Sequence, residues 1–226
     1  MHTDAKDFLL SGLAILSLAV LTFLGVRFLV QPLSTVLGDW HWLVDAPMLL
    51  LVYGLLSSLL VRSMLAAFPL RPGEYSMRDT HFTYWKFYTV VHEFGRGALL
   101  PFTTVFAKPL VAMLFGARVG RNTAMGGMLV DPPLIAIGDF AILGLDSAIV
   151  AHAITSGSII LKEVRIGQGA TVGVHAVIMP GVSVGDGAVV TAGSVVTMNT
   201  TIPPNELWGG IPARKIKDLQ PSDVRD

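Results

Sequence analysis

The sequence contains no cysteine, and this absence excludes several kinds of chemistry. Without cysteine the chain has no disulfides, no thiolate metal ligands and no cysteine nucleophile. Charged residues are also scarce, at 14% of 226 residues, and the formal net charge is zero. A neutral chain offers no general surface for polyanions, so nucleic acid is not an expected partner.

Apolar residues, by contrast, are abundant. They make up 52% of the chain, and the mean hydropathy is +0.63. This composition is too apolar for an ordinary soluble domain and predicts contact with a membrane.

The first long apolar run extends from Phe8 to Val26 and contains no charged residue. It is long enough to cross a bilayer as a helix, although a signal peptide is an alternative. A signal peptide needs a positive N-terminal region, but here Lys6 lies between Asp4 and Asp7. We therefore expect a retained transmembrane helix.

A second apolar run, Ala46–Val61, predicts a second transmembrane helix. Trp40 and Trp42 precede it, as interfacial aromatic residues do. The loop between the runs has a single basic residue, whereas basic residues are frequent after the second run, which predicts a cytoplasmic location for the chain beyond that run. These residues are Arg62, Arg71, Arg78, Lys86, Arg96, Lys108 and Arg118.

The segment after the second run mixes apolar and polar residues. His81–Leu100 suits a helix lying in the membrane interface, or else a helix packed on the following domain. His92 within it is expected at a surface or interface rather than in catalysis. Pro101 and Pro109 interrupt Leu99–Ala117, which favours a broken interfacial or re-entrant segment over a third span.

A six-residue period begins at Val119. Aliphatic residues recur at its first position, glycine is frequent at its second, and small residues occupy its fifth. Stacking at this fixed period is typical of a β-helix, since an amphipathic helix would need a period near 3.6. The first positions are Val119, Met125, Asp131, Ile137, Leu143 and Ile149, then Ile166, Val172, Ile178, Val184, Val190, Val196 and Ile202, with Asp131 as an exception.

The fourth position of the repeat predicts tight corners. It carries residue types that tolerate a positive φ, apart from Phe140. The first-position side chains are then expected to point inward and stack between coils. The corner residues are Asn122, Asp146, Gly169, Gly187, Gly193 and Asn199.

These repeats resemble those of the hexapeptide-repeat acyltransferases. The resemblance implies a mainly β fold, a left-handed parallel β-helix, here preceded by two transmembrane helices and interfacial helices. The N-terminal half is similar to a narrower branch, the membrane-anchored terminal domain of poly-lysine synthetase-type peptide synthetases and related exopolysaccharide acetyltransferases. The motifs are Val164-Arg165-Ile166-Gly167, Ile178-Met179-Pro180-Gly181-Val182, Ala192-Gly193-Ser194-Val195-Val196 and Gly210-Ile211-Pro212-Ala213-Arg214 in the repeats, and Pro72-Gly73-Glu74-Tyr75, Tyr84-Trp85 and Phe115-Gly116-Ala117-Arg118-Val119-Gly120 before them.

Four segments are therefore expected. Residues 1–70 form two transmembrane helices, and 71–118 form interfacial or connecting helices. Residues 119–213 form the β-helix acyltransferase domain, and 214–226 form a C-terminal tail. This organisation implies a multi-pass protein of the plasma (inner) membrane with a cytoplasmic catalytic domain.

The six-residue frame breaks between Ile154 and Ile166, which predicts a loop, and loops on solenoids often carry binding sites. By resemblance, His152 beside this loop is the general base; alternatively it is a corner residue tolerant of a positive φ. His175 lies in an unbroken coil and is expected to be such a corner residue. Asp146 or Glu163 could orient the His152 imidazole; the alternative is that both are solvated surface residues.

The resemblance also implies acetyl-CoA as co-substrate, bound between neighbouring subunits of a homotrimer, and no metal. Glycine and small residues would let the pantetheine arm approach the backbone, and basic residues would hold its phosphates, unless they form only a solvated tail. Trp208 would cover the last coil. The cofactor-binding residues are Gly193, Ser194, Gly210, Pro212, Ala213, Arg214 and Lys215, with Lys217 as a further phosphate ligand.

Three functions are compatible with this pattern. The first is acetyl transfer from acetyl-CoA to a hydroxyl of a membrane-associated, lipid-linked or saccharide acceptor. The second is a γ-type carbonic anhydrase, which needs three histidine ligands, whereas the repeat half has only His152 and His175. The third is a non-catalytic trimeric membrane scaffold, or an amide-forming assembly module of the peptide-synthetase type.

Overall fold

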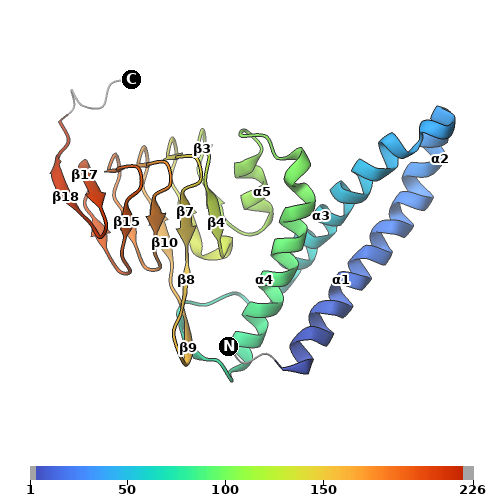
Figure 1. Cartoon of the computed structure of the whole chain (residues 1–226), viewed down its shortest axis with the longest axis horizontal. Helices are drawn as coiled ribbons and strands as arrows, with labels where there is room; N and C mark the ends of the chain where they lie inside the picture. Colours follow the sequence, from blue (N-terminus) through green and yellow to red (C-terminus); the bar gives the residue numbers. More distant parts are fainter. Residues whose placement is uncertain (1–3, 221–226) are drawn as a thin grey trace. The chain divides into compact units, whose positions relative to one another are not determined.

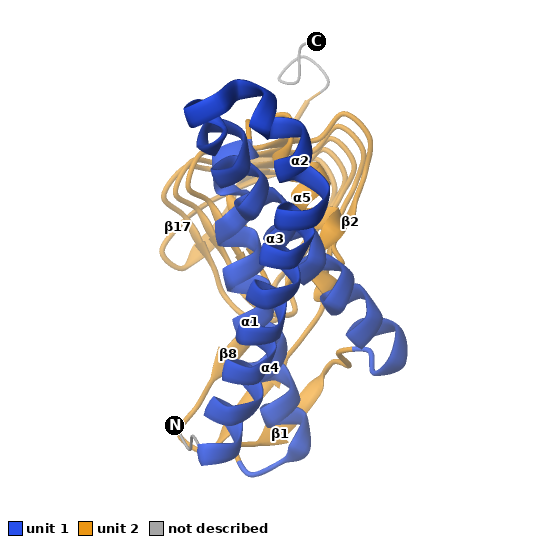
Figure 2. Cartoon of the chain, turned by 90° about the vertical axis from the view of Figure 1, so that its right-hand side faces the viewer, with its two compact units in different colours: residues 1–69, 78–103 blue, residues 70–77, 104–226 orange. Residues whose placement is uncertain are grey.

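The computed structural model describes residues 4–220. The chain forms two compact units, which Figure 2 distinguishes by colour. The helical unit comprises the residues up to 69 together with 78–103, and the solenoid unit comprises 70–77 and the residues from 104 onward. Of the expected tail, 221–226 lies outside the described residues.

The helical unit contains two helices that are long and apolar enough to cross a membrane. The first extends from Ala5 to Trp40, and the second, α3, extends from Trp42 to Ala67. The first begins as α1 (Ala5–Gly25) and continues through a π-helical turn (Val26–Val30), α2 (Gln31–Ser34) and a 3₁₀ helix (Thr35–Trp40). Both apolar runs of the sequence are therefore helical.

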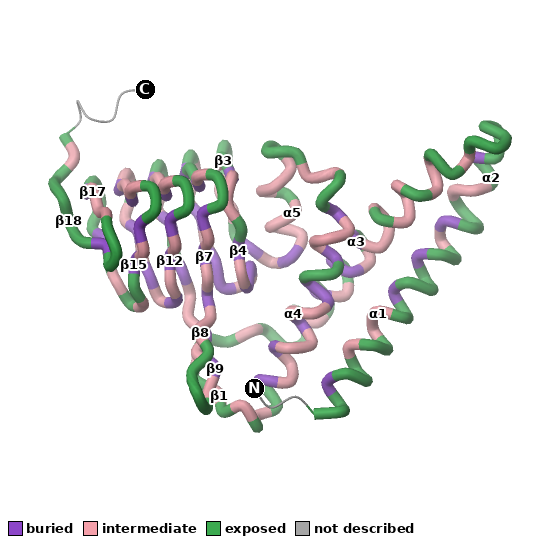
Figure 3. Tube along the Cα trace, in the orientation of Figure 1, coloured by how far each residue is buried: buried purple, intermediate pink, exposed green. Residues whose placement is uncertain are grey.

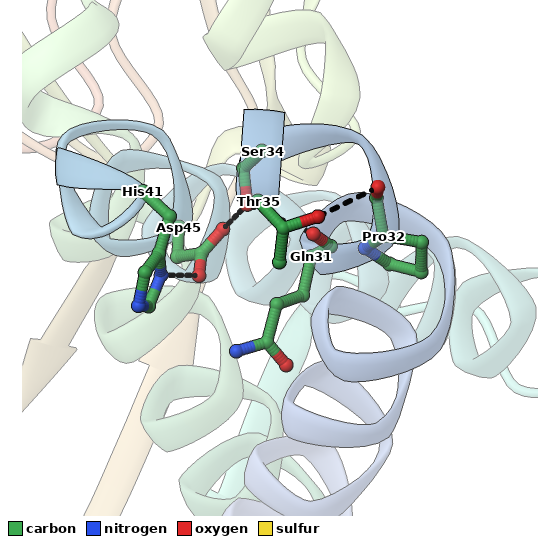
Figure 4. A network of polar contacts seen from close by, with 6 residues as sticks. All are labelled: Gln31, Pro32, Ser34, Thr35, His41 and Asp45. Carbon is green, nitrogen blue, oxygen red and sulfur yellow. Dashed lines mark hydrogen bonds and ion pairs between the residues drawn. The ribbon is translucent and has the colours of Figure 1, made fainter. Parts of the chain in front are cut away.

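A polar network holds together the apex between these two helices (Figure 4). The Asp45 carboxylate accepts a hydrogen bond from Ser34 Oγ at 2.6 Å and contacts His41 Nδ1 at 2.7 Å. These groups satisfy one another, whereas Trp40 and Val36 on the same apex are largely exposed. The apex thus exposes Trp40 and Val36, while Ser34, His41 and Asp45 are bonded to one another.

Helix α4 (Thr80–Leu99) packs on α3 and α1 within the helical unit. Asp79 caps its first turn by accepting the His81 backbone N–H at 2.8 Å. His92 lies on the buried side, 2% exposed and stacked on the Tyr88 ring. The surface position expected for His92 is therefore wrong, because one face of α4 is covered by the two longer helices.

The segment after α4 is broken at both prolines, as expected. A short 3₁₀ turn spans Leu100–Phe102, and α5 spans only Lys108–Leu114. Each proline lies in the first turn of its short helix. Backbone N–H groups in a first turn have no hydrogen-bond acceptor within the helix, so proline, which lacks an N–H, is tolerated there.

The repeats form a parallel β-solenoid, as predicted, with three faces built from stacked short strands (Figure 1). We name the faces B, C and D in the order in which the chain meets them. Face B stacks β2 (Arg118–Val119), β5 (Ile135–Ile137), β10 (Val164–Ile166), β13 (Ser183–Val184) and β16 (Thr201–Ile202). Face C stacks β3 (Ala124–Met125), β6 (Ile142–Leu143), β11 (Thr171–Val172), β14 (Val189–Val190), β17 (Glu206–Gly210) and β18 (Ala213–Asp218); face D stacks β4 (Met128–Val130), β7 (Ala148–Val150), β12 (Val177–Ile178) and β15 (Val195–Val196).

Most residues at the first position are buried and form the core of the solenoid (Figure 3). Ile149, Val172, Ile178, Val190 and Val196 are all 0% exposed. The corner prediction is confirmed at every fourth-position residue named for it. Positive φ angles occur at Asn122, Asp146, Gly169, Gly187, Gly193 and Asn199, and also at Phe140 and His175.

The first coil departs from the expected frame. Leu129, not Asp131, pairs with Ile149 and fills the core. The turn Gly126–Gly127 between β3 and β4 has two residues, whereas the corresponding corners of later coils have four. The segment that runs from β4 into β5 restores the two missing residues, and it contains a 3₁₀ turn (Pro132–Leu134). Asp131 therefore lies just beyond the end of β4, not in the aliphatic row.

The second-position glycines are required by the close stacking of coils. At Gly173 a Cβ would lie 2.4 Å from the backbone nitrogen of Ala192 in the next coil.

We expect Gly173→Ala to lower the free energy of unfolding by about 1–3 kcal/mol, because a rigid backbone cannot yield to the methyl group. Gly169→Asn is the matched control, since Gly169 has a φ of +64° and no neighbour within 4 Å, and asparagine tolerates this conformation. Chemical denaturation of both variants compares them; equal stability would contradict the stacking explanation.

The last coil is closed by an antiparallel pair, β17 and β18. Trp208 takes the place of the inward residue beside Val190, and its indole N–H donates to Glu206 Oε2 at 2.7 Å. This large side chain covers the end of the core, as a terminal repeat must.

Candidate active site

His152 lies where the chain leaves the solenoid. It is the first residue of β8 (His152–Ile154), which pairs antiparallel with β9 (Ser158–Leu161). This hairpin replaces the corner between β7 and β10 and explains the break in the six-residue frame. His152 is in a strand and not in a left-handed corner, so the corner alternative is wrong for His152 and correct for His175.

A buried carboxylate fixes the His152 ring. Its Nδ1 lies 2.5 Å from Oδ2 of Asp131, and Asp131 is 2% exposed. Because a carboxylate accepts at Nδ1, the neutral ring carries its hydrogen there and has Nε2 as its acceptor nitrogen. The side chain of His152 is 20% exposed, so solvent and small molecules reach it.

Asp131, not Asp146 or Glu163, is the carboxylate that orients His152. Glu163 pairs with Arg165 at 2.8 Å, and Asp146 occupies a corner between faces C and D. Asp131 has a left-handed backbone (φ 62°, ψ 61°) that turns its side chain out of the strand direction. The signal was present in the sequence, because Asp131 is an acidic residue in an otherwise aliphatic row.

A third strand supports the His152 hairpin. Residues Gly73–Ser76 form β1, which pairs antiparallel with β9. Gly73, Leu161 and His152 lie side by side across this sheet. Ser158 Oγ also donates to Glu74 Oε1 at 2.6 Å. The segment that links α3 to α4 thus holds the hairpin that begins at His152.

The structure brings together most of the residues expected to bind the cofactor. Ser194 is buried, and its Oγ accepts the Gly210 backbone N–H at 3.2 Å. Gly193 lies in the adjacent corner, and Gly210 pairs with Ala213 at the turn that contains Pro212. Hydrogen bonding and strand pairing thus place these five residues next to one another at the capped end of the solenoid.

The two basic candidates differ in their surroundings. Lys215 Nζ bonds Asp218 at 2.6 Å and Glu206 at 2.7 Å, and these contacts raise the pKa of the ammonium group. Its charge is therefore already balanced within the chain. Arg214 uses one guanidinium nitrogen to donate to the Ala213 carbonyl oxygen at 3.0 Å, and its side chain is exposed.

One chain does not bring His152 and the cofactor-binding residues together. His152 follows the end of strand β7 on face D, whereas Gly193 and Ser194 precede strand β15 on that face. The two groups therefore lie at opposite ends of the face D strands, two coils apart.

Comparison with known proteins identifies the class of the solenoid. A family model described as the hexapeptide repeat of succinyl-transferase matches residues 163–198. The galactoside O-acetyltransferase of Escherichia coli (strain K12) is 30% identical over 129 residues, which cover 52% of this chain and 63% of that protein. The chain thus spans less than two thirds of this relative's length.

A solved structure supports the fold. Galactoside acetyltransferase in complex with coenzyme A is 20% identical, with a TM-score of 0.53 over 72% of this chain and 92% of that chain. The solenoid is thus similar in repeat and fold to hexapeptide-repeat acyltransferases.

A carbonic anhydrase is also among the similar proteins. Gamma carbonic anhydrase 1 of Arabidopsis thaliana is 36% identical over 80 residues, which cover 27% of that protein. Among residues 4–220, no group of three or more histidine, cysteine, aspartate or glutamate residues is placed to hold a metal ion. His152 begins β8 after face D, whereas His175 lies in the corner between faces C and D, so the residues present do not fit a three-histidine zinc site.

Proposed function

We propose that this protein is a membrane-anchored acetyltransferase that moves an acetyl group from acetyl-CoA to a hydroxyl of a membrane-associated or saccharide acceptor. The observation that carries the proposal is the Asp131–His152 pair at the base of the hairpin. In this arrangement His152 is the general base and Asp131 is its positioning residue.

The pair suits the chemistry of acetyl transfer. An acceptor hydroxyl is a poor nucleophile until a base takes its proton. His152 Nε2 takes that proton while the acceptor oxygen attacks the thioester carbonyl carbon. The carbon–sulfur bond then breaks, and the coenzyme A thiolate leaves and accepts the proton. Asp131 stabilises the imidazolium in between by its charge.

The donor site is proposed to comprise Gly193, Ser194, Gly210, Pro212 and Ala213, with Arg214 toward the phosphates. Backbone groups at these small residues allow close approach by the pantetheine arm. Lys215 contributes less direct charge, because Asp218 and Glu206 already pair with it.

A homotrimer would complete the site by joining His152 of one subunit to the donor residues of the next. The outward rows of the parallel strands β3, β6, β11, β14 and β17 of face C and of all strands of face D support this assembly, because they carry no charged residue. The outward row of face B, by contrast, includes Arg118 and Arg165. Apolar outward rows are expected where subunits pack. The rows are Ala124, Ile142, Thr171, Val189 and Leu207 on face C, and Met128, Ala148, Val177 and Val195 on face D.

Membrane anchoring is proposed from the two apolar helices. Their free faces expose large apolar side chains, including Phe8, Leu16 and Phe28, each at least 60% exposed. The basic residues that follow α3 favour a multi-pass protein of the plasma (inner) membrane with the solenoid on the cytoplasmic side, where acetyl-CoA is available. An acceptor attached to a lipid would be concentrated at the same surface.

Turnover of acetyl-CoA by the full chain in detergent, against a panel of lipid-linked sugars, tests this function. We expect release of coenzyme A that depends on the acceptor, and light scattering is expected to give the mass of three chains plus detergent. Failure to bind acetyl-CoA in calorimetry would reject catalysis and favour the scaffold.

A further inference from the structure

Helices α3 and α4 enclose a groove that acetyl transfer does not use. It has a volume of about 490 Å³ and lies entirely within the helical unit. The helices approach closely beside it, because a Cβ at Gly54 would lie 3.1 Å from the Gly95 carbonyl oxygen. The lining residues are Leu50, Tyr53, Glu93, Phe94, Gly97 and Ala98.

The groove is apolar except for two groups. Glu93 is bonded by His92 Nδ1 at 3.3 Å and by Arg96 Nη2 at 2.6 Å. The hydrogen bond from His92, and then that from Arg96, lower the pKa of Glu93 to about 2, so it is an ionised acceptor at neutral pH. The second group is the Tyr53 hydroxyl, whose oxygen is buried.

Small residues create the hollow. At Gly97 a Cβ would meet nothing within 4 Å. An apolar chain would therefore find open space beside Gly97 and Ala98, with Leu50 and Phe94 available for contact. Since α3 is apolar enough to cross a membrane, lipid is the ligand with the readiest access to this groove.

We propose that the groove binds one lipid that has a single apolar chain and a neutral head rich in hydroxyl groups. The chain would lie along Leu50, Phe94, Gly97 and Ala98. A head hydroxyl would donate to the Glu93 carboxylate and accept from the Tyr53 hydroxyl. A carboxylate head, as in a fatty acid, would be repelled by Glu93. This inference rests on the proposed membrane anchoring and not on acetyl transfer, and it would give a lipid-linked acceptor a holding site.

A photoaffinity experiment tests the groove. The full chain is placed in phosphatidylcholine nanodiscs with a dodecyl glucoside that carries a diazirine in its chain, and labelled peptides are identified by mass spectrometry. We expect labelling of α3 and α4 that is about tenfold weaker in Gly97→Leu, because the leucine side chain occupies the space of several methylene groups. Gly12→Leu is the matched control, since a Cβ at Gly12 also meets nothing within 4 Å.

Head-group selectivity provides the second measurement. Unlabelled dodecyl glucoside should compete about tenfold better than dodecanoate in the wild type, and Glu93→Gln should abolish that preference. Equal labelling of Gly97→Leu and wild type, or no preference between heads, would overturn the proposal. Acetyl-CoA turnover is measured in the same nanodiscs: labelling without turnover would reject the acetyltransferase function alone, and turnover without selective labelling would reject the groove alone.

Discussion

Replacement of His152 by alanine is expected to slow acetyl transfer by about 10²–10⁴-fold, because the acceptor hydroxyl loses its general base. The mass of the proposed trimer and the affinity for acetyl-CoA should not change, since His152 is not among the residues proposed for the donor site. The rate is followed by reaction of released coenzyme A with a thiol reagent. The chain itself contributes no thiol to this assay, as it has no cysteine.

Two further variants separate catalysis from structure. Asp131→Asn keeps the size of the side chain and a residue type that tolerates its left-handed backbone, but it removes the charge that orients His152. We expect a lower kcat with little change in KM for acetyl-CoA. His175→Asn is the control, because His175 occupies a left-handed corner and should be dispensable. Full activity of His152→Ala would reject its role as the base.

Lys86→Met is expected to lower the free energy of unfolding of the helical unit by about 3–5 kcal/mol, because it leaves the buried Asp7 carboxylate without its cation. Lys86 Nζ bonds Asp7 Oδ2, and the two side chains are only 10% and 9% exposed. The same ammonium group lies 4.7 Å from the centre of the Phe82 ring. Thermal unfolding of the purified protein in detergent, followed by circular dichroism, measures the effect.

The double variant Asp7→Asn/Lys86→Met should recover much of that loss, because it removes the uncompensated charge as well. Arg165→Met is the control for loss of an ion pair at the surface. Arg165 is 68% exposed in its pair with Glu163, and exposed pairs contribute at most about 1 kcal/mol. Equal effects of Lys86→Met and Arg165→Met would show that burial of the Asp7 pair has no energetic consequence.

The Asp7–Lys86 pair also bears on how the N-terminal helix is interpreted. From the sequence, Asp7 counted only as a negative charge in a poor signal-peptide region. In the structure it joins the start of α1 to α4, 79 residues away. A helix held by a buried ion pair to its neighbour is an integral part of the unit. The contact was not predictable because nothing local in the sequence relates these two residues.

The periodic part of the fold was predictable residue by residue. Size and backbone preference act locally: aliphatic residues such as Val172 and Ile178 can only fill the core of a coil, and Asn122 or Gly169 can adopt its corners at little cost. Phe140 shows the limit of this rule, since stacking of neighbouring coils imposes a positive φ of 59° on a bulky residue.

The sequence by itself determined the β-solenoid, its corners, the two apolar helices and the place of His152 beside the broken repeat. Only the tertiary structure decided that Asp131 orients His152 across 21 residues, and that Glu74 in β1 bonds Ser158 in β9 across 84 residues. The physical reason is register. A two-residue shortening of one corner moves Asp131 out of the core row, and strand pairing, which depends on the whole coil, brings it to the imidazole.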